Sequence, residues 1–152
     1  QAFHEKFGLS RDRPARPSFP TADLARFRLG FLLEELAEFA SASGARAVGL
    51  KLKLLAVEAR TAELYAADRG LVGAFDALLD LSVVALGTAD FHGFPWEAGW
   101  DAVLERNLAK RRAKPDGSDS KRGSPHDVVK PEGWHGPEAA LAALLDRDAG
   151  DR

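Results

Sequence analysis

Apolar residues recur every three or four positions along four long stretches of the chain, which is the spacing of residues on one face of an α-helix. The first stretch begins near Thr21 and Asp23, either of which can cap the free N–H groups of a helix start. The second opens with a strand-like alternation, but its apolar pattern continues too long for a strand. The spacing predicts helices over residues 23–42, 48–70, 71–91 and 96–113.

The remaining segments are rich in proline and glycine, which predicts irregular structure. Residues 1–20 read as an arm with one short amphipathic piece, and the C-terminal tail ends in a short helix over 137–146. We find no convincing strand and no internal repeat. We therefore expect an all-α fold, a bundle of four long helices. It forms a single domain over 1–152, with the helical core at 21–112 and the tail at 113–152.

Two carboxylates lie in the most apolar of these predicted helices. Asp76 and Asp80 are the only charged residues between Leu71 and Ala89, and because they are four residues apart they share a helical face. We expect this helix to be largely buried rather than to span a membrane, because the aspartates interrupt the apolar run. An ionised carboxylate in an apolar environment costs several kcal/mol unless something compensates its charge.

The helix predicted over 23–42 carries three more carboxylates, Glu34, Glu35 and Glu38, which project from neighbouring positions. If the two acidic helices pack together, up to five carboxylates converge and could not all stay ionised without a cation. Because Mg²⁺ and Mn²⁺ prefer oxygen ligands, we expect a shared metal site. Two other interpretations stay open: a solvated glutamate face, and aspartates paired with Arg or Lys. A di-iron site would want a Glu-x-x-His motif, which neither cluster has.

The distribution of charge along the chain is more informative about function than the overall composition is. The 152 residues include no cysteine, which excludes disulfides, thiol catalysis and cysteine-ligated zinc. The chain shows no signal-peptide pattern, so we expect a soluble cytoplasmic protein. Residues 106–130 contain eight Lys or Arg and three Asp, a net charge of about +5 in a chain whose net charge is −2. An acidic body with a basic tail suggests a phosphate-bearing partner.

Four segments together resemble a known family: FLLEELAEF, FDALLDLSVVALGTA, RNLAKRR and SKRGSPHDVVKPEGW. They are similar to the all-α nucleoside triphosphate pyrophosphohydrolases of the MazG-like group, in particular to compact phage and bacterial members. The resemblance covers residues from about 23 to 134. It implies that Glu35, Glu38 and Asp80 bind Mg²⁺ or Mn²⁺, with two or more ions per site, and that Glu34 orients or deprotonates the attacking water.

The resemblance also implies that Asn107 and Lys110 lie near the phosphates or sugar of the substrate. The family's common second motif is Glu-x-x-Asp, whereas here Ala77 stands three residues before Asp80 and the nearest acid is Asp76. Asp76 is therefore expected either as a fourth metal ligand or as a support for the ligands. The other cations expected to stabilise the triphosphate and the leaving pyrophosphate are Arg111, Lys121, Arg122 and Lys130.

The reaction implied is hydrolysis between the α- and β-phosphates of a (d)NTP, which gives a nucleoside monophosphate and pyrophosphate. We favour a purine substrate, dGTP or GTP, as in some phage members, with dUTP or dCTP as the alternative. A nucleic-acid-binding module stays open, although residues 106–130 contain no aromatic side chain for base stacking. Broad apolar helix faces indicate self-association to a dimer or tetramer, and we expect neither a membrane nor a nucleic-acid partner. Trp134 is expected to anchor the tail on the body.

Overall fold

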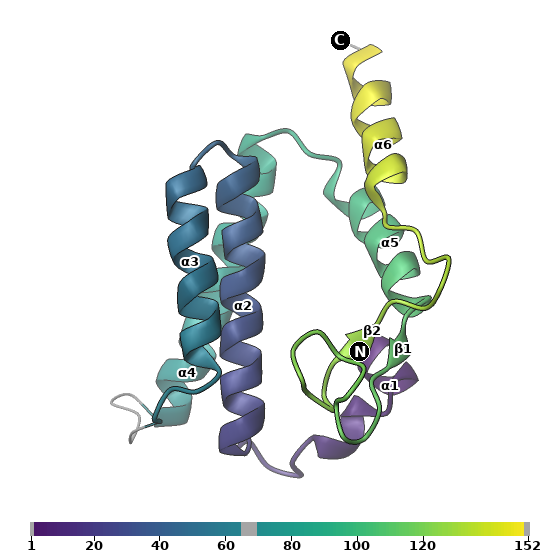
Figure 1. Cartoon of the computed structure of the whole chain (residues 1–152). Helices are drawn as coiled ribbons and strands as arrows, with labels where there is room; N and C mark the ends of the chain where they lie inside the picture. The colour runs from purple at the N-terminus through teal and green to yellow at the C-terminus, as the bar shows by residue number, and fades with distance from the viewer. Residues whose placement is uncertain (1, 65–69, 151–152) are drawn as a thin grey trace. The chain divides into compact units, whose positions relative to one another are not determined.

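The computed structural model describes residues 2–64 and 70–150, with side chains omitted at 11–12 and 147–150. The described part is mainly helical, which confirms the all-α class (Figure 1). Its elements, in chain order, are α1 (Ala2–Lys6), the 3₁₀ helix η1 (Leu9–Asp12), α2 (Ala22–Ala42), α3 (Arg46–Ala59), α4 (Gly70–Phe91), α5 (Trp96–Leu108), strands β1 (Arg111–Arg112) and β2 (Val128–Val129), and α6 (Glu138–Gly150).

Two of the predicted helices have nearly the expected bounds. Helix α2 begins after Thr21, whose Oγ1 accepts a hydrogen bond from the Leu24 N–H at 3.4 Å, so the predicted cap is confirmed. Helix α4 covers the predicted stretch with one more residue at its start. The last helix, α6, also forms at the predicted place and continues to Gly150. The helical periodicity of the sequence was therefore sufficient to locate these elements.

The other two long helices are shorter than predicted. Helix α3 ends at Ala59, and the expected continuation over 60–64 is wrong, while its remainder over 65–69 lies outside the described residues. The Ala62 carbonyl accepts a hydrogen bond from Arg26 Nε at 2.7 Å, which ties this segment to α2. Helix α5 ends at Leu108, because Arg111 and Arg112 pair with β2 instead of continuing the helix.

The chain divides into two compact units, which we describe separately. The hairpin unit comprises residues 14–71, and the tail unit comprises residues 1–13 and 72–152. The metal ligands expected on α2 therefore belong to one unit, and those expected on α4 belong to the other. The single domain expected from the sequence stays a prediction.

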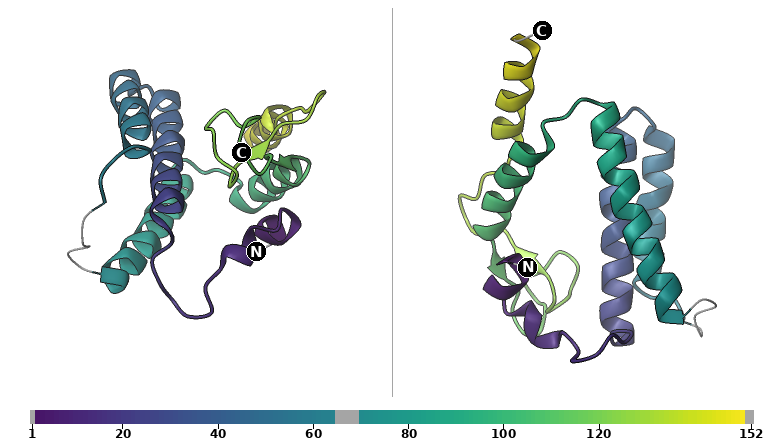
Figure 2. Two further views of the ribbon diagram at one scale, coloured as in Figure 1. Left: turned by 60° about the horizontal axis from the view of Figure 1, so that its bottom comes forward. Right: turned by 180° about the vertical axis from the view of Figure 1, so that it is seen from behind.

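The hairpin unit consists of α2 and α3, which lie side by side in all views (Figures 1 and 2). Small residues line their contact: a Cβ added to Gly30 would lie 2.9 Å from the Ala56 carbonyl oxygen, and one added to Gly49 would lie 2.9 Å from that of Ala37. The two backbones are thus too close for larger side chains. The large apolar side chains that remain exposed on these helices are Leu29, Leu32, Leu36, Phe39, Val48, Leu50, Leu54, Leu55 and Val57.

In the tail unit, α4 is exposed along most of its length, so its own unit does not provide the burial that was expected for it. Only 6% of its most apolar 18-residue window is buried, and its buried residues are Gly73 and Ala89, near its two ends. A helix that is apolar on all sides needs covering on all sides. By length and hydropathy α4 could also cross a membrane, but core helices of soluble proteins meet the same criteria.

The glycine contacts predict opposite effects of the same substitution at two helical positions. Gly30→Ala should lower the free energy of unfolding by up to about 2 kcal/mol, because overpacking costs about 1–3 kcal/mol and is offset only in part by the gain in helix propensity of about 1 kcal/mol. Gly87→Ala, on α4, has no atom within 4 Å of the added Cβ and should gain that propensity. Urea unfolding of both variants, followed by circular dichroism, would measure the difference. Equal stability of the two variants would contradict the close approach of α2 and α3.

Candidate functional site

The three glutamates of α2 lie in different surroundings. Glu35 and Glu38 are exposed, as expected for carboxylates that project from consecutive turns into solvent. Glu34 instead faces α3 and forms an ion pair through its Oε1 with Nη2 of Arg60. Both of these side chains are 24% exposed, so the pair is shielded from most of the solvent. The glutamate run is therefore not a uniformly solvated helix face.

The Arg60 contact was missed by sequence reasoning, because it depends on the register between α2 and α3. Arg60 is the residue immediately after α3, and the chain leaves the helical path there. The guanidinium of Arg60 holds Oε1 of Glu34 and thereby limits the orientation of this carboxylate. The side chains of Glu35 and Glu38 are exposed.

Asp76 and Asp80 lie one turn apart on α4, and both are exposed. They are surrounded on that helix by exposed apolar side chains such as Phe75 and Leu79. Within residues 2–64 and 70–150, no group of three or more His, Asp or Glu side chains is arranged to hold a metal ion. Because the acidic residues of α2 and α4 belong to different units, their convergence on a shared ion stays a prediction.

Several tail cations that we expected near phosphates are engaged within the tail. Arg111 Nη1 pairs with Asp119 at 2.6 Å, and Arg122 Nη1 pairs with Asp127 at 3.2 Å. Lys121 and Lys130 are exposed. The cations of residues 106–130 therefore do not form one uniform basic surface, since the two arginines pair with two of the three aspartates in this segment.

Strands β1 and β2, of two residues each, pair antiparallel and were not predicted. The stretch between them, residues 113–127, consists of turns and bends, which confirms the irregular structure expected there. We call residues 111–129 the tail hairpin. Asp127, which is 3% exposed, accepts hydrogen bonds from Ser120 Oγ at 2.7 Å and from the Val128 N–H at 2.8 Å, in addition to its pair with Arg122. Its carbonyl oxygen accepts from the Ala113 N–H. A buried carboxylate saturated in this way closes the tail hairpin.

Trp134 attaches the tail to α5, as predicted. Its indole Nε1–H donates to the carbonyl oxygen of Arg106 at 3.0 Å. Two lysines approach the same ring: Lys110 Nζ lies 5.3 Å and Lys130 Nζ 4.5 Å from its centroid. Asn107 is half-buried and lies one helical turn before Lys110. The structure therefore brings Lys130 next to a cation that the sequence placed near the substrate.

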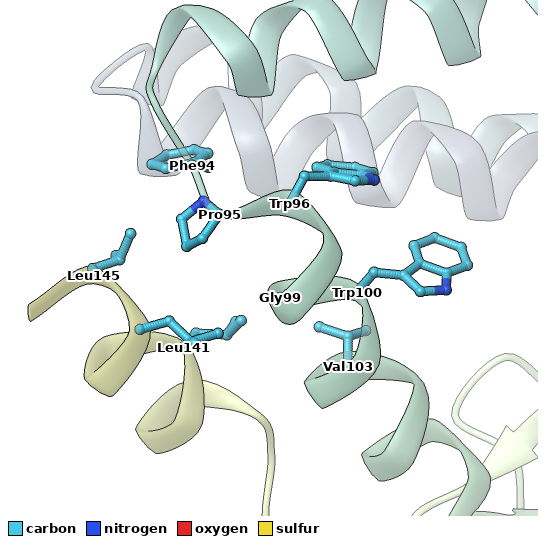
Figure 3. A pocket seen from close by; sticks show the side chains of 9 residues that line it. Phe94, Pro95, Trp96, Gly99, Trp100, Val103, Leu141 and Leu145 are labelled. Atoms are coloured by element: carbon cyan, nitrogen blue, oxygen red, sulfur yellow. The ribbon is translucent and has the colours of Figure 1, made fainter. Parts of the chain in front are cut away.

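An apolar cavity of about 410 Å³ lies between α5 and α6 and was not anticipated from the sequence (Figure 3). Its lining includes Phe94, Trp96, Trp100, Leu141 and Leu145, and it contains none of the residues expected at the site. The lining is almost entirely apolar and contains no charged side chain that could hold a triphosphate. The cavity is therefore not a candidate for the phosphate-binding site.

Comparison with known proteins gives one match. The sequence model of a family described as phosphoribosyl-ATP pyrophosphohydrolase matches residues 1–107. The matched range contains both acidic helices and ends at Asn107, so the tail hairpin and Trp134 lie beyond it. Neither the curated proteins nor the solved structures compared with the chain gave a match.

The tail hairpin should lose order in acid. The pKa of Asp119 is lowered, first by the hydrogen bond from the Lys114 N–H and then by the Arg111 guanidinium. A carboxyl with a lowered folded pKa stabilises the fold above its unfolded pKa of about 3.9, and this contribution is lost as pH falls through the folded pKa. The Lys114 amide resonance in NMR should titrate below about pH 3.9. This titration of the Lys114 amide should be absent in Asp119→Asn and unchanged in the control variant Glu132→Gln. If the Lys114 amide of Asp119→Asn titrated as in the wild type, the role of Asp119 would be refuted.

Proposed function

The chain belongs to the phosphoribosyl-ATP pyrophosphohydrolase family, and from that premise we propose that it is a metal-dependent enzyme that cleaves nucleoside triphosphates between the α- and β-phosphates. Pyrophosphohydrolase activity on a nucleotide is what this family implies. The finer steps, namely the bond cleaved, the metal and the base, are our proposal. The observation that carries it is that one family match spans both acidic helices, with Glu35 and Glu38 on α2 and Asp76 and Asp80 on α4.

The donor groups suit Mg²⁺ or Mn²⁺, because they are all carboxylate oxygens. Glu35, Glu38 and Asp80 would hold the metal, and their exposure makes them accessible to ions. Asp76 would either join them or support Asp80 from the preceding turn. When bound, such ions neutralise phosphate oxygens and lower the pKa of a coordinated water. The proposal requires α2 and α4 to approach until their carboxylates share an ion.

The remaining residues have roles that their surroundings support. Glu34, whose orientation is set by its ion pair with Arg60, would orient or deprotonate the attacking water. Asn107 and Lys110, on the last turn of α5 and just after it, would contact the sugar or the phosphates. Phosphoryl-type transfer needs mainly alignment and neutralisation of charge, and this set of residues supplies both without a protein nucleophile.

For the substrate we propose a purine nucleotide, with dGTP or GTP favoured, as in the phage members that the chain resembles. The description of the matched family also names a purine nucleotide, phosphoribosyl-ATP, which is the second candidate. A pyrimidine substrate, dUTP or dCTP, is the alternative. A nucleic-acid-binding module is less well supported than before, because Arg111 and Arg122 are paired with carboxylates inside the tail. We place the activity in the cytoplasm.

Pyrophosphate release with Mg²⁺, compared across dGTP, GTP, phosphoribosyl-ATP, dATP, dUTP and dCTP, tests the proposal. Glu35→Gln, Glu38→Gln and Asp80→Asn should each lower kcat/KM about 100-fold or more, because a lost metal ligand weakens charge neutralisation by several kcal/mol and each 1.36 kcal/mol is tenfold. Chelation should abolish turnover and added Mg²⁺ restore it. Glu58→Gln, at an exposed glutamate of α3, is the matched control. Absence of turnover with every nucleotide would reject the function.

We also propose self-association, because large apolar side chains are exposed on α2, α3 and α4. Burial of apolar surface is worth about 25 cal/mol per Å², so covering these faces would stabilise an assembly. Light scattering coupled to size exclusion should give a dimer or tetramer. Phe75→Arg and Val84→Glu, both on exposed positions of α4, should shift the equilibrium toward the monomer. A wild-type monomer at high concentration would contradict the proposal.

A further inference from the structure

Two lysines that are 20 residues apart in sequence meet on one aromatic ring. The ammonium groups of Lys110 and Lys130 lie 5.3 Å and 4.5 Å from the centroid of Trp134, which is the distance of a cation–π contact. We propose that Trp134 is a positioning residue that holds these two lysines as a pair for the phosphates of the substrate. The inference rests on the proposed function, and it adds a residue to which neither the sequence motifs nor the family match assigns a role toward substrate.

The ring contact orders the lysines without removing their charge. An ammonium paired with a carboxylate is neutralised, as Arg111 is by Asp119 and Arg122 by Asp127. An aromatic ring attracts a cation through its quadrupole, and the formal positive charge is kept. Two positive charges held near one ring raise the local potential, which favours a polyanion such as a triphosphate or pyrophosphate.

Trp134 is itself fixed by two backbone contacts. Its indole N–H donates to the Arg106 carbonyl on the last turn of α5, and its backbone N–H donates to the Pro131 carbonyl across a turn that contains Gly133 with φ 72°. The first contact places the ring next to the segment that carries Asn107 and Lys110. The second places it next to Lys130, which directly follows β2.

Holding a lysine side chain in advance reduces the entropy that binding would otherwise cost. A free lysine loses about 2 kcal/mol of rotamer freedom when it is immobilised, and two lysines ordered by a common ring lose part of this on folding instead. The same ring also couples them, so the loss of one lysine should depend on whether Trp134 is present. This coupling separates positioning from independent electrostatic contributions.

The test measures binding of inorganic pyrophosphate to the full-length protein by isothermal titration calorimetry, together with kcat and KM for the preferred nucleotide. The variants are Trp134→Leu, Trp134→Phe, Lys110→Met, Lys130→Met, and Lys130→Met combined with Trp134→Leu. Lys114→Met removes an exposed charge from the same tail and is the control. Circular dichroism and thermal melting establish that each variant is folded.

We expect Trp134→Leu to weaken pyrophosphate binding and raise KM about tenfold, with a smaller change in kcat, because loss of one charge-assisted contact is of that order. Trp134→Phe keeps a ring and should stay within about threefold of wild type. Lys130→Met should weaken binding strongly in the wild-type background and little in Trp134→Leu. Lys114→Met should change nothing.

Two results would overturn the inference: unchanged pyrophosphate binding in folded Trp134→Leu, or strictly additive effects of Trp134→Leu and Lys130→Met. If Trp134→Leu does not fold, Trp134→Phe is compared with Lys110→Met and Lys130→Met instead. Loss of pyrophosphate binding in the two lysine variants, together with retained binding in Trp134→Phe, would support the positioning role of the ring. Failure of the proposed function can be distinguished from failure of this inference. In that case the wild-type protein hydrolyses no nucleotide, while its pyrophosphate binding still depends on Trp134 and both lysines.

Discussion

The structure depends on the close approach of α2 and α3, which small residues at Gly30, Gly49, Ala37 and Ala56 make possible. Because the contact is made largely of glycine and alanine, many of the leucines of these helices and Phe39 are exposed, whereas Phe27 is buried. The described chain contains no large side chain that is completely buried. The same approach brings Arg60 within reach of Glu34. One packing constraint thus sets both the exposed apolar surface and the orientation of a candidate catalytic carboxylate.

The exposed apolar surface and the carboxylates constrain each other. On α4, Asp76 and Asp80 project from a helix whose other side chains are almost all apolar. Any surface that covers this helix excludes water and lowers the local dielectric constant, which makes an uncompensated carboxylate costly. Covering α4 therefore favours a cation or an arginine at the aspartates. Assembly and metal binding would then be thermodynamically linked, since each reduces the cost of the other.

Sequence reasoning located elements from local signals and failed where tertiary contacts decided. The Thr21 cap and the apolar periodicity placed α2 and α4 well, because both signals act within a few residues. After the early end of α3 the Ala62 carbonyl is held by Arg26, and beyond the end of α5 Arg111 and Arg112 pair with β2; both are tertiary contacts. The candidate acids were found as motifs, whereas the Arg60–Glu34 pair required the register of two helices.

The basic tail shows why a charge count is a poor guide to a binding surface. Eight cations in 25 residues suggested a phosphate site. However, Arg111 and Arg122 form ion pairs with the half-buried Asp119 and the buried Asp127, and these pairs stabilise the tail hairpin. The planar guanidinium group of arginine is well suited to hydrogen-bond with the carboxylate oxygens of an aspartate that lies close to it in sequence. Two of the four lysines of this segment, Lys110 and Lys130, instead lie against the ring of Trp134. The two arginines thus help to build the tail, whereas under our proposal the two lysines at the ring serve the phosphates of the substrate.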